Sequence, residues 1–157
     1  MAEVDSAGLG EPGFPATEST SAVAARRGLD LAQHQSQLLT ADLINSADLV
    51  LGMERVHVRE VVLASPPAWP RTFTLKELVR RGEALGPIEP GEPLGAWLDR
   101  AHEGRRTQEL LGASPVDDIA DPTGGPIGEH EDLAAELEDL VGGLVNLVCP
   151  DERAPIR

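Results

Sequence analysis

The chain has 157 residues, 41% of them hydrophobic and 25% charged, which is enough for one domain with its own core. Its net charge of −14 argues against nucleic acid and anionic membranes as partners, because both attract clustered lysine and arginine. No apolar run approaches the ~20 residues that cross a bilayer. The first residues, Met1 to Asp5, lack the basic and apolar parts of a signal peptide. We therefore expect a cytoplasmic protein that binds neither nucleic acid nor membrane.

Strand and helix patterns alternate in the first third of the chain. Residues 3–8 have the pattern of a short strand, and residues 17–27 suit a helix that Gly28 would end. Thr40 is the expected N-cap of another short helix. Residues 47–52 are nearly all apolar, which is typical of a parallel strand buried on both faces.

The same alternation continues through the middle of the chain. The predicted elements are a helix over 54–64, a strand over 71–75, a helix over 75–81, a linker over 82–93 and a helix over 94–103 anchored by Trp97 and Leu98. Alternating strands and helices predict an α/β fold with a parallel sheet.

The last helix has the most regular pattern in the chain. Its apolar residues recur at spacings of three and four, and its acidic residues fill the predicted solvent side. The apolar set is Leu133, Leu137, Leu140, Leu144 and Val148, and the acidic set is Glu131, Asp132, Glu136, Glu138 and Asp139. The acidic residues also favour the N-terminal half of the helix through its dipole.

Four segments, in this order, resemble the low-molecular-weight protein tyrosine phosphatases. They are Val4-Asp5-Ser6-Ala7-Gly8, residues 25–31 with His34 and 38–40 after them, residues 47–53, and Asp121-Pro122-Thr123-Gly124-Gly125-Pro126 before the long helix. The resemblance covers residues 3 to 148. It implies a three-layer α/β/α fold whose first strand and first helix are absent here. The phosphatase-like domain would span residues 1–148, with a tail over 149–157.

The resemblance implies hydrolysis of phosphate monoesters through a phosphocysteine intermediate. Such an enzyme needs a thiolate nucleophile and an acid that protonates the leaving oxygen. Asp121 matches the family's acid, and Pro122 would restrict the backbone that aims its carboxyl group. From residue chemistry alone, Asp121-Pro122 is more simply a turn opener.

The family's nucleophile lies in a Cys-x5-Arg loop, and these 157 residues contain no such motif. The only cysteine is Cys149, and Pro155 stands six positions after it, where an arginine would be needed. Cys149 also follows a helix C-terminus, whereas the family's nucleophile lies at a helix N-terminus. We therefore expect an incidental thiol there, no nucleophile, no phosphate-binding residue, and a chain that is inactive as it stands.

Three histories would explain this pattern. The start codon of a working phosphatase gene was placed too late, or the chain is a pseudophosphatase that acts as a binding module. The third is descent from the arsenate-reducing branch, which needs several cysteines. A missing strand would also leave strand edges exposed, which favours self-association.

The substrate stays open between phosphotyrosine, phosphoarginine and another phosphomonoester. Gln37 stands where the family often has arginine, and Thr123 replaces an aromatic residue that would stack on a phenyl ring. An active form would act on a phosphorylated protein or a small phosphomonoester. The sequence does not assign a role to residues 82–115.

We expect neither a metal nor a cofactor. The four histidines, at positions 34, 57, 102 and 130, form no His-x3-His pair on one helix. One cysteine excludes both an internal disulfide and a cysteine-based zinc site.

Overall fold

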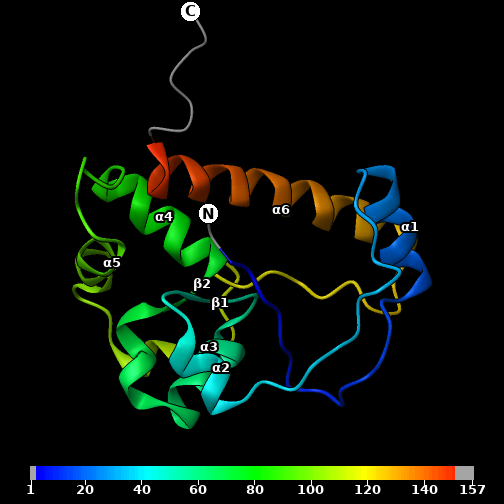
Figure 1. Ribbon diagram of the computed structural model, residues 1–157, viewed down its shortest axis with the longest axis horizontal. Coiled ribbons are helices and arrows are strands. Elements are labelled where there is room, and N and C mark those ends of the chain that lie inside the picture. The colour runs from blue at the N-terminus through cyan, green and yellow to red at the C-terminus, as the bar shows by residue number, and fades with distance from the viewer. Residues whose placement is uncertain (1–2, 151–157) are drawn as a thin grey trace, which may run out of the picture.

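A parallel pair of short strands lies at the centre of the structure, a computed structural model that describes residues 3–150 (Figure 1). Strand β1 (Val50–Gly52) pairs with β2 (Thr72–Thr74), so that Leu51 lies opposite Phe73. The chain crosses from one to the other through helix α3 (Arg55–Ala64) and the 3-10 helix η1 (Pro66–Arg71). Among the described residues the sheet holds these two strands, and one edge of β1 has no strand beside it.

Alternate residues of the β1 segment face opposite sides of the sheet. Leu49 and Leu51 pack against the larger core, whereas Val50 packs against a smaller one. The smaller core is formed by Ile44, Val61 and Ala68. These come from α2 (Ala41–Ser46), α3 and η1.

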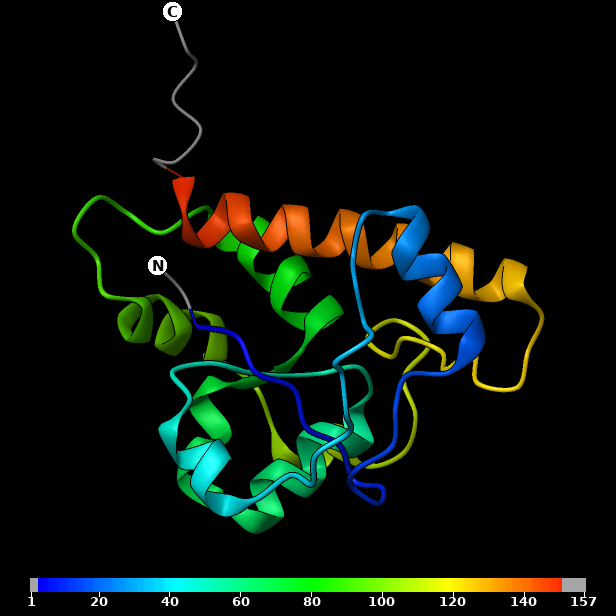
Figure 2. The same ribbon diagram turned by 45° about the vertical axis from the view of Figure 1, so that its right-hand side comes forward.

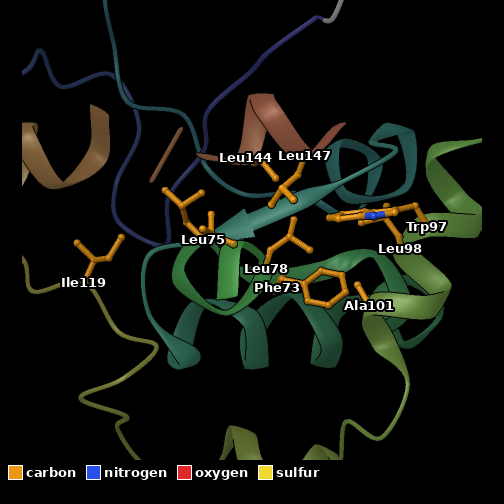
Figure 3. Packing of buried hydrophobic residues seen from close by; sticks show 10 residues of the cluster. Phe73, Leu75, Leu78, Trp97, Leu98, Ala101, Ile119, Leu144 and Leu147 are labelled. Atoms are coloured by element: carbon orange, nitrogen blue, oxygen red, sulfur yellow. The ribbon is translucent and has the colours of Figure 1, made fainter. Parts of the chain in front are cut away.

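Three helices cover the other side of the sheet (Figure 3). They are α4 (Leu75–Leu85), α5 (Leu94–His102) and α6 (Ile127–Val148). Their core consists of Phe73, Leu75, Leu78, Val79, Trp97, Leu98, Ala101, Ile119, Leu144 and Leu147. The predicted anchors Trp97 and Leu98 are confirmed, and so is the three-layer α/β/α fold.

Helix α1 (Glu18–Arg26) lies beside the N-terminal half of α6, away from the sheet (Figures 1 and 2). Its N-cap is Thr17, and Gly28 follows it with a φ of 76°, as predicted. Val23 is the only buried residue between positions 3 and 40. The predicted strand over 3–8 is wrong: residues 3–7 form no strand, and Gly8 makes one isolated bridge to Leu38.

Most other predicted helices and strands occur with shifted ends. Thr40 caps α2 as predicted, but β1 begins only at Val50. The carbonyl of Ala47 instead accepts a hydrogen bond from Arg71 Nε at 2.9 Å. Helix α4 continues four residues beyond Arg81 into the predicted linker and ends before Gly86, whose φ is 87°.

The acidic side of α6 faces solvent only in part. Glu136 pairs with Lys76 at 2.6 Å, Glu131 pairs with Arg26 at the end of α1, and Glu138 pairs with Arg27 directly after it. A short 3-10 helix, η2 (Thr107–Leu110), lies in the segment to which the sequence assigns no role. None of the helices in residues 3–150 combines the length and apolarity that a membrane crossing requires.

Candidate functional site

The loop between η2 and α6 carries Asp121, and its first half is fixed to the end of β1. The amide of Ile119 donates to the carbonyl of Met53 at 2.9 Å, directly after β1. The carboxylate of Asp118 accepts from the amides of Arg55 at 2.8 Å and Ser114 at 2.6 Å. The loop is therefore held at the carboxyl end of the sheet, where open α/β folds bind their ligands.

Asp117 adds a second fastening to the same loop. Its side chain is nearly buried and makes ion pairs of 2.9 Å to Arg55 and 2.8 Å to Arg80. Burial raises the pKa of this carboxyl group, but hydrogen bonds and charge from Arg80 and Arg55 outweigh it and leave the pKa lowered. Asp117 is thus a charged residue that ties the loop to α3 and α4.

Asp121 lies C-terminal to the residues that make these contacts, and its side chain is exposed. Its Oδ1 accepts a hydrogen bond from the amide of Thr123 at 2.9 Å. Hydrogen bonding from Thr123 lowers the pKa of Asp121, and the nearby His130 and His57 add to this effect. In the structure as it stands Asp121 is therefore ionised at neutral pH.

Two of the four histidines lie near Asp121. His57 stands at the start of α3, where its Nδ1 accepts from the amide of Glu54 at 3.2 Å. His130 is buried in the first turn of α6. Residues 3–150 contain no group of His, Cys, Asp and Glu side chains arranged to hold a metal ion.

Cys149 is at the opposite end of α6 from the Asp121 loop. A helix of 22 residues separates the two, a length of about 33 Å. The thiol is exposed and borders a shallow hollow of about 290 Å³ lined by residues 88–92 and 148–150. This distance excludes a direct reaction between Cys149 and a group held at Asp121.

A buried polar cluster lies beside the sheet and was not predicted. Arg105 makes two hydrogen bonds to Glu77, of 2.8 and 2.9 Å, and donates to the carbonyl of Thr72 at 2.8 Å. Its guanidinium lies between the rings of Trp69 and Phe73, 3.8 and 4.0 Å from their centroids. This cluster fastens the segment after α5 to β2 and α4, which gives part of residues 82–115 a structural role.

Residues 1–90 match the family described as low molecular weight phosphotyrosine protein phosphatase. The chain belongs to this phosphatase family. A relative named "Probable low molecular weight protein-tyrosine-phosphatase EpsP", from Ralstonia solanacearum, is 40% identical over 111 residues. That alignment covers 62% of this chain and 75% of the relative.

Two solved phosphatases have the same fold. The tyrosine phosphatase AmsI of Erwinia amylovora has a TM-score of 0.63 and 26% identity, covering 91% of this chain and 72% of its own. The YwlE arginine phosphatase of Geobacillus stearothermophilus has a TM-score of 0.64 and 30% identity, covering 92% and 72%. These structures therefore include members named for two different phosphorylated amino acids.

Proposed function

We propose that this chain carries the acid half of a phosphomonoesterase site, with Asp121 as the general acid. The observation that carries the proposal is the fastening of the Asp121 loop to the end of β1 through Ile119 and Met53. The nucleophile and the phosphate-binding arginine would come from a Cys-x5-Arg loop, which these 157 residues do not contain. The 157 residues alone would therefore not hydrolyse phosphate esters.

Asp121 would act by giving its proton to the leaving oxygen. Its carboxyl group is ionised in the structure, so it must gain a proton before it can act as an acid. A phosphate dianion bound nearby favours this, because a like charge raises a carboxyl pKa. Exposure beyond the fixed part of the loop leaves Asp121 free to meet a substrate.

The test uses a chain extended with an upstream Cys-x5-Arg loop. Asp121→Asn should lower turnover by about 10²–10⁴-fold. The loss should be larger for an alkyl phosphate than for an activated aryl phosphate, since a poor leaving group depends more on protonation. Asp139→Asn, an exposed residue of α6, is the matched control. Asp117 and Asp118 are unsuitable controls because both hold the loop.

Equal losses of turnover on both substrates would show that Asp121 has a structural role and is not the general acid. The 157 residues alone should hydrolyse para-nitrophenyl phosphate no faster than buffer does. Turnover that survives purification and disappears in Cys149→Ser would overturn the proposal.

The missing motif also supports a second candidate, a pseudophosphatase that binds a phosphorylated protein without cleaving it. Calorimetric titration with phosphotyrosine and phosphoarginine peptides tests this candidate, and no heat with either peptide would count against it. Thr123 provides no ring for a phenyl group, so substrates other than phosphotyrosine belong in both assays. We also propose a cytoplasmic location and self-association through the open edge of β1.

A further inference from the structure

His102, the last residue of α5, contacts the buried guanidinium of Arg105 through one of its ring nitrogens. Its Nδ1 lies 3.1 Å from Nη1 of Arg105. An arginine side chain has only N–H donors, so Arg105 donates this hydrogen bond and Nδ1 accepts it. A nitrogen that accepts carries no proton, and the ring of His102 is therefore neutral, with its proton on Nε2.

The guanidinium of Arg105 has little freedom to move away from His102. Its side chain is 1% exposed, and it also binds both carboxylate oxygens of Glu77 and the carbonyl of Thr72. It lies between two aromatic rings, 3.8 and 4.0 Å from their centroids. A proton on Nδ1 of His102 would therefore remove a hydrogen bond and place two positive charges side by side in a buried site, where repulsion is strong.

Charged residues face His102 from two helices and from the turn after α5. They are Arg81 and Glu77 of α4, Asp99 of α5, and Arg105. From η1 the ring of Trp69 lies 5.2 Å from the imidazole and carries no charge. Burial lowers the pKa of His102, and the two arginine charges lower it further, whereas the two carboxylates act in the opposite direction. The surroundings on every side thus favour the neutral ring on balance.

We infer that His102 is a pH switch, whose protonation releases residues 102–110 from η1, β2 and α4. Arg105 joins this segment to all three elements. The backbone hydrogen bonds of the segment close only single turns, which need tertiary contacts to stay in place. The switch concerns the fold alone and does not depend on the function proposed for Asp121.

The direction of the pH dependence follows from the two states of the segment. In the released segment His102 has the ordinary imidazole pKa of ~6.5, whereas in the closed structure its pKa is lower. Protons therefore bind preferentially to the open form as pH falls below about 6.5. The closed form is fully favoured above that pH, and its advantage is lost as pH falls toward the folded-state pKa.

A titration of the natural 157-residue chain by NMR tests the hydrogen bond directly. The ring signals of His102 should titrate at a lower pH than those of His34, which is exposed. Nitrogen shifts above that transition should show the proton of His102 on Nε2. Titration of His102 at or above the pH of His34, or a proton on Nδ1 in the neutral ring, would overturn the inference.

Hydrogen exchange measures the release of the segment. Between pH 7 and pH 5, the protection of the amides of residues 103–111, corrected for intrinsic exchange rates, should fall about 3- to 10-fold. Protection that stays constant over this range would show that a proton on His102 opens nothing.

Two variants separate the switch from other effects of acid. In His102→Asn the amide oxygen can accept from Arg105 at any pH, so the protection of residues 103–111 should no longer depend on pH. His34→Asn is the matched control and should keep the pH dependence of the natural chain. An equally steep fall in His102→Asn would assign the effect to another group and overturn the inference. If His102→Asn does not fold, the titration and the exchange of the natural chain still decide the question.

Discussion

Two aspartates four residues apart in the same loop have different surroundings. Asp117 is nearly buried between Arg55 and Arg80, and Asp121 is exposed and bonded only to its own turn. Both have a lowered pKa, but for different reasons: ion pairing at Asp117 and a local hydrogen bond at Asp121. A lowered pKa therefore does not identify the catalytic residue, whereas exposure beyond the fastened part of the loop does favour Asp121.

Asp117→Asn should destabilise the protein by about 1–3 kcal/mol at neutral pH, since two charged hydrogen bonds lose their acceptor charge. The folded-state pKa lies below the unfolded value of ~3.9. The contribution of Asp117 is therefore fully present above that value and is lost as pH falls through the folded-state pKa. Urea unfolding of both proteins from pH 7 to pH 3 measures this. A difference that stays constant over that range would contradict the prediction.

The buried pair of Arg105 and Glu77 should tolerate double replacement better than single replacement. Arg105→Met leaves the Glu77 carboxylate without its main partner and should cost about 3–5 kcal/mol. The double variant Arg105→Met with Glu77→Gln should recover part of that loss, because the buried carboxylate is gone and only Arg81, which is partly exposed, loses a partner. A double-mutant cycle by chemical denaturation measures the coupling. Additive losses would show that the stacking of Arg105 on Trp69 matters more than the ion pair.

At the level of elements, the contact between α4 and α6 depends on a glycine. A Cβ at Gly82 would lie 2.7 Å from Leu147 Cδ1 and 2.9 Å from Trp97 Cζ2. Both neighbours belong to the larger core, so neither can move without disturbing it. The close approach of the two helices therefore needs a residue with no side chain in the middle of α4.

Gly82→Ala should destabilise the protein by about 1–3 kcal/mol, because overpacking exceeds the gain in helix propensity of ~1 kcal/mol. Gly142→Ala in α6 is the matched control, since a Cβ there meets nothing within 4 Å. It should stabilise by about 0.5–1 kcal/mol. Thermal unfolding of the two variants decides the matter. A stabilising Gly82→Ala would show that the helices separate at little cost.

Sequence patterns predicted those helices that depend on a local capping residue or on a periodic apolar stripe. Thr17 and Thr40 cap their helices through their own side chains, and the stripe of α6 meets the core as its spacing requires. The segment over 3–8 failed because a strand depends on a neighbour, which no local pattern supplies. Of the candidate site, sequence patterns named only Asp121, and its role as the acid stays a prediction. Its fastening by Arg55, Arg80 and Asp118 joins positions up to 63 residues apart, with no spacing signal to find them.

At the level of the whole molecule, the sheet has only two described strands, although helices pack on both of its faces. The open edge of β1 leaves backbone groups that another strand could bind. Several aliphatic and aromatic side chains between residues 4 and 39 are also exposed, among them Val4, Phe14 and Leu29. A net charge of −14 opposes association, so added salt should favour it.

We therefore expect the chain either to self-associate or to be marginally stable. Light scattering at increasing concentration should show a mass above that of the monomer, and more so at higher salt. A chain that stays monomeric should melt below the ~65 °C typical of stable domains. A monomer that melts cooperatively well above that temperature would contradict this expectation.

The two tryptophans allow unfolding to be followed by intrinsic fluorescence. The chain has no tyrosine, so its ultraviolet emission comes from Trp69 and Trp97 alone. Trp97 is fully buried and donates to the carbonyl of Gly86 at 3.0 Å, between α4 and α5. Trp69 is stacked on Arg105, with the ring of His102 edge-on at 5.2 Å. Replacing either indole with phenylalanine would thus leave a single fluorophore that reports opening of the helical core or of the guanidinium cluster separately.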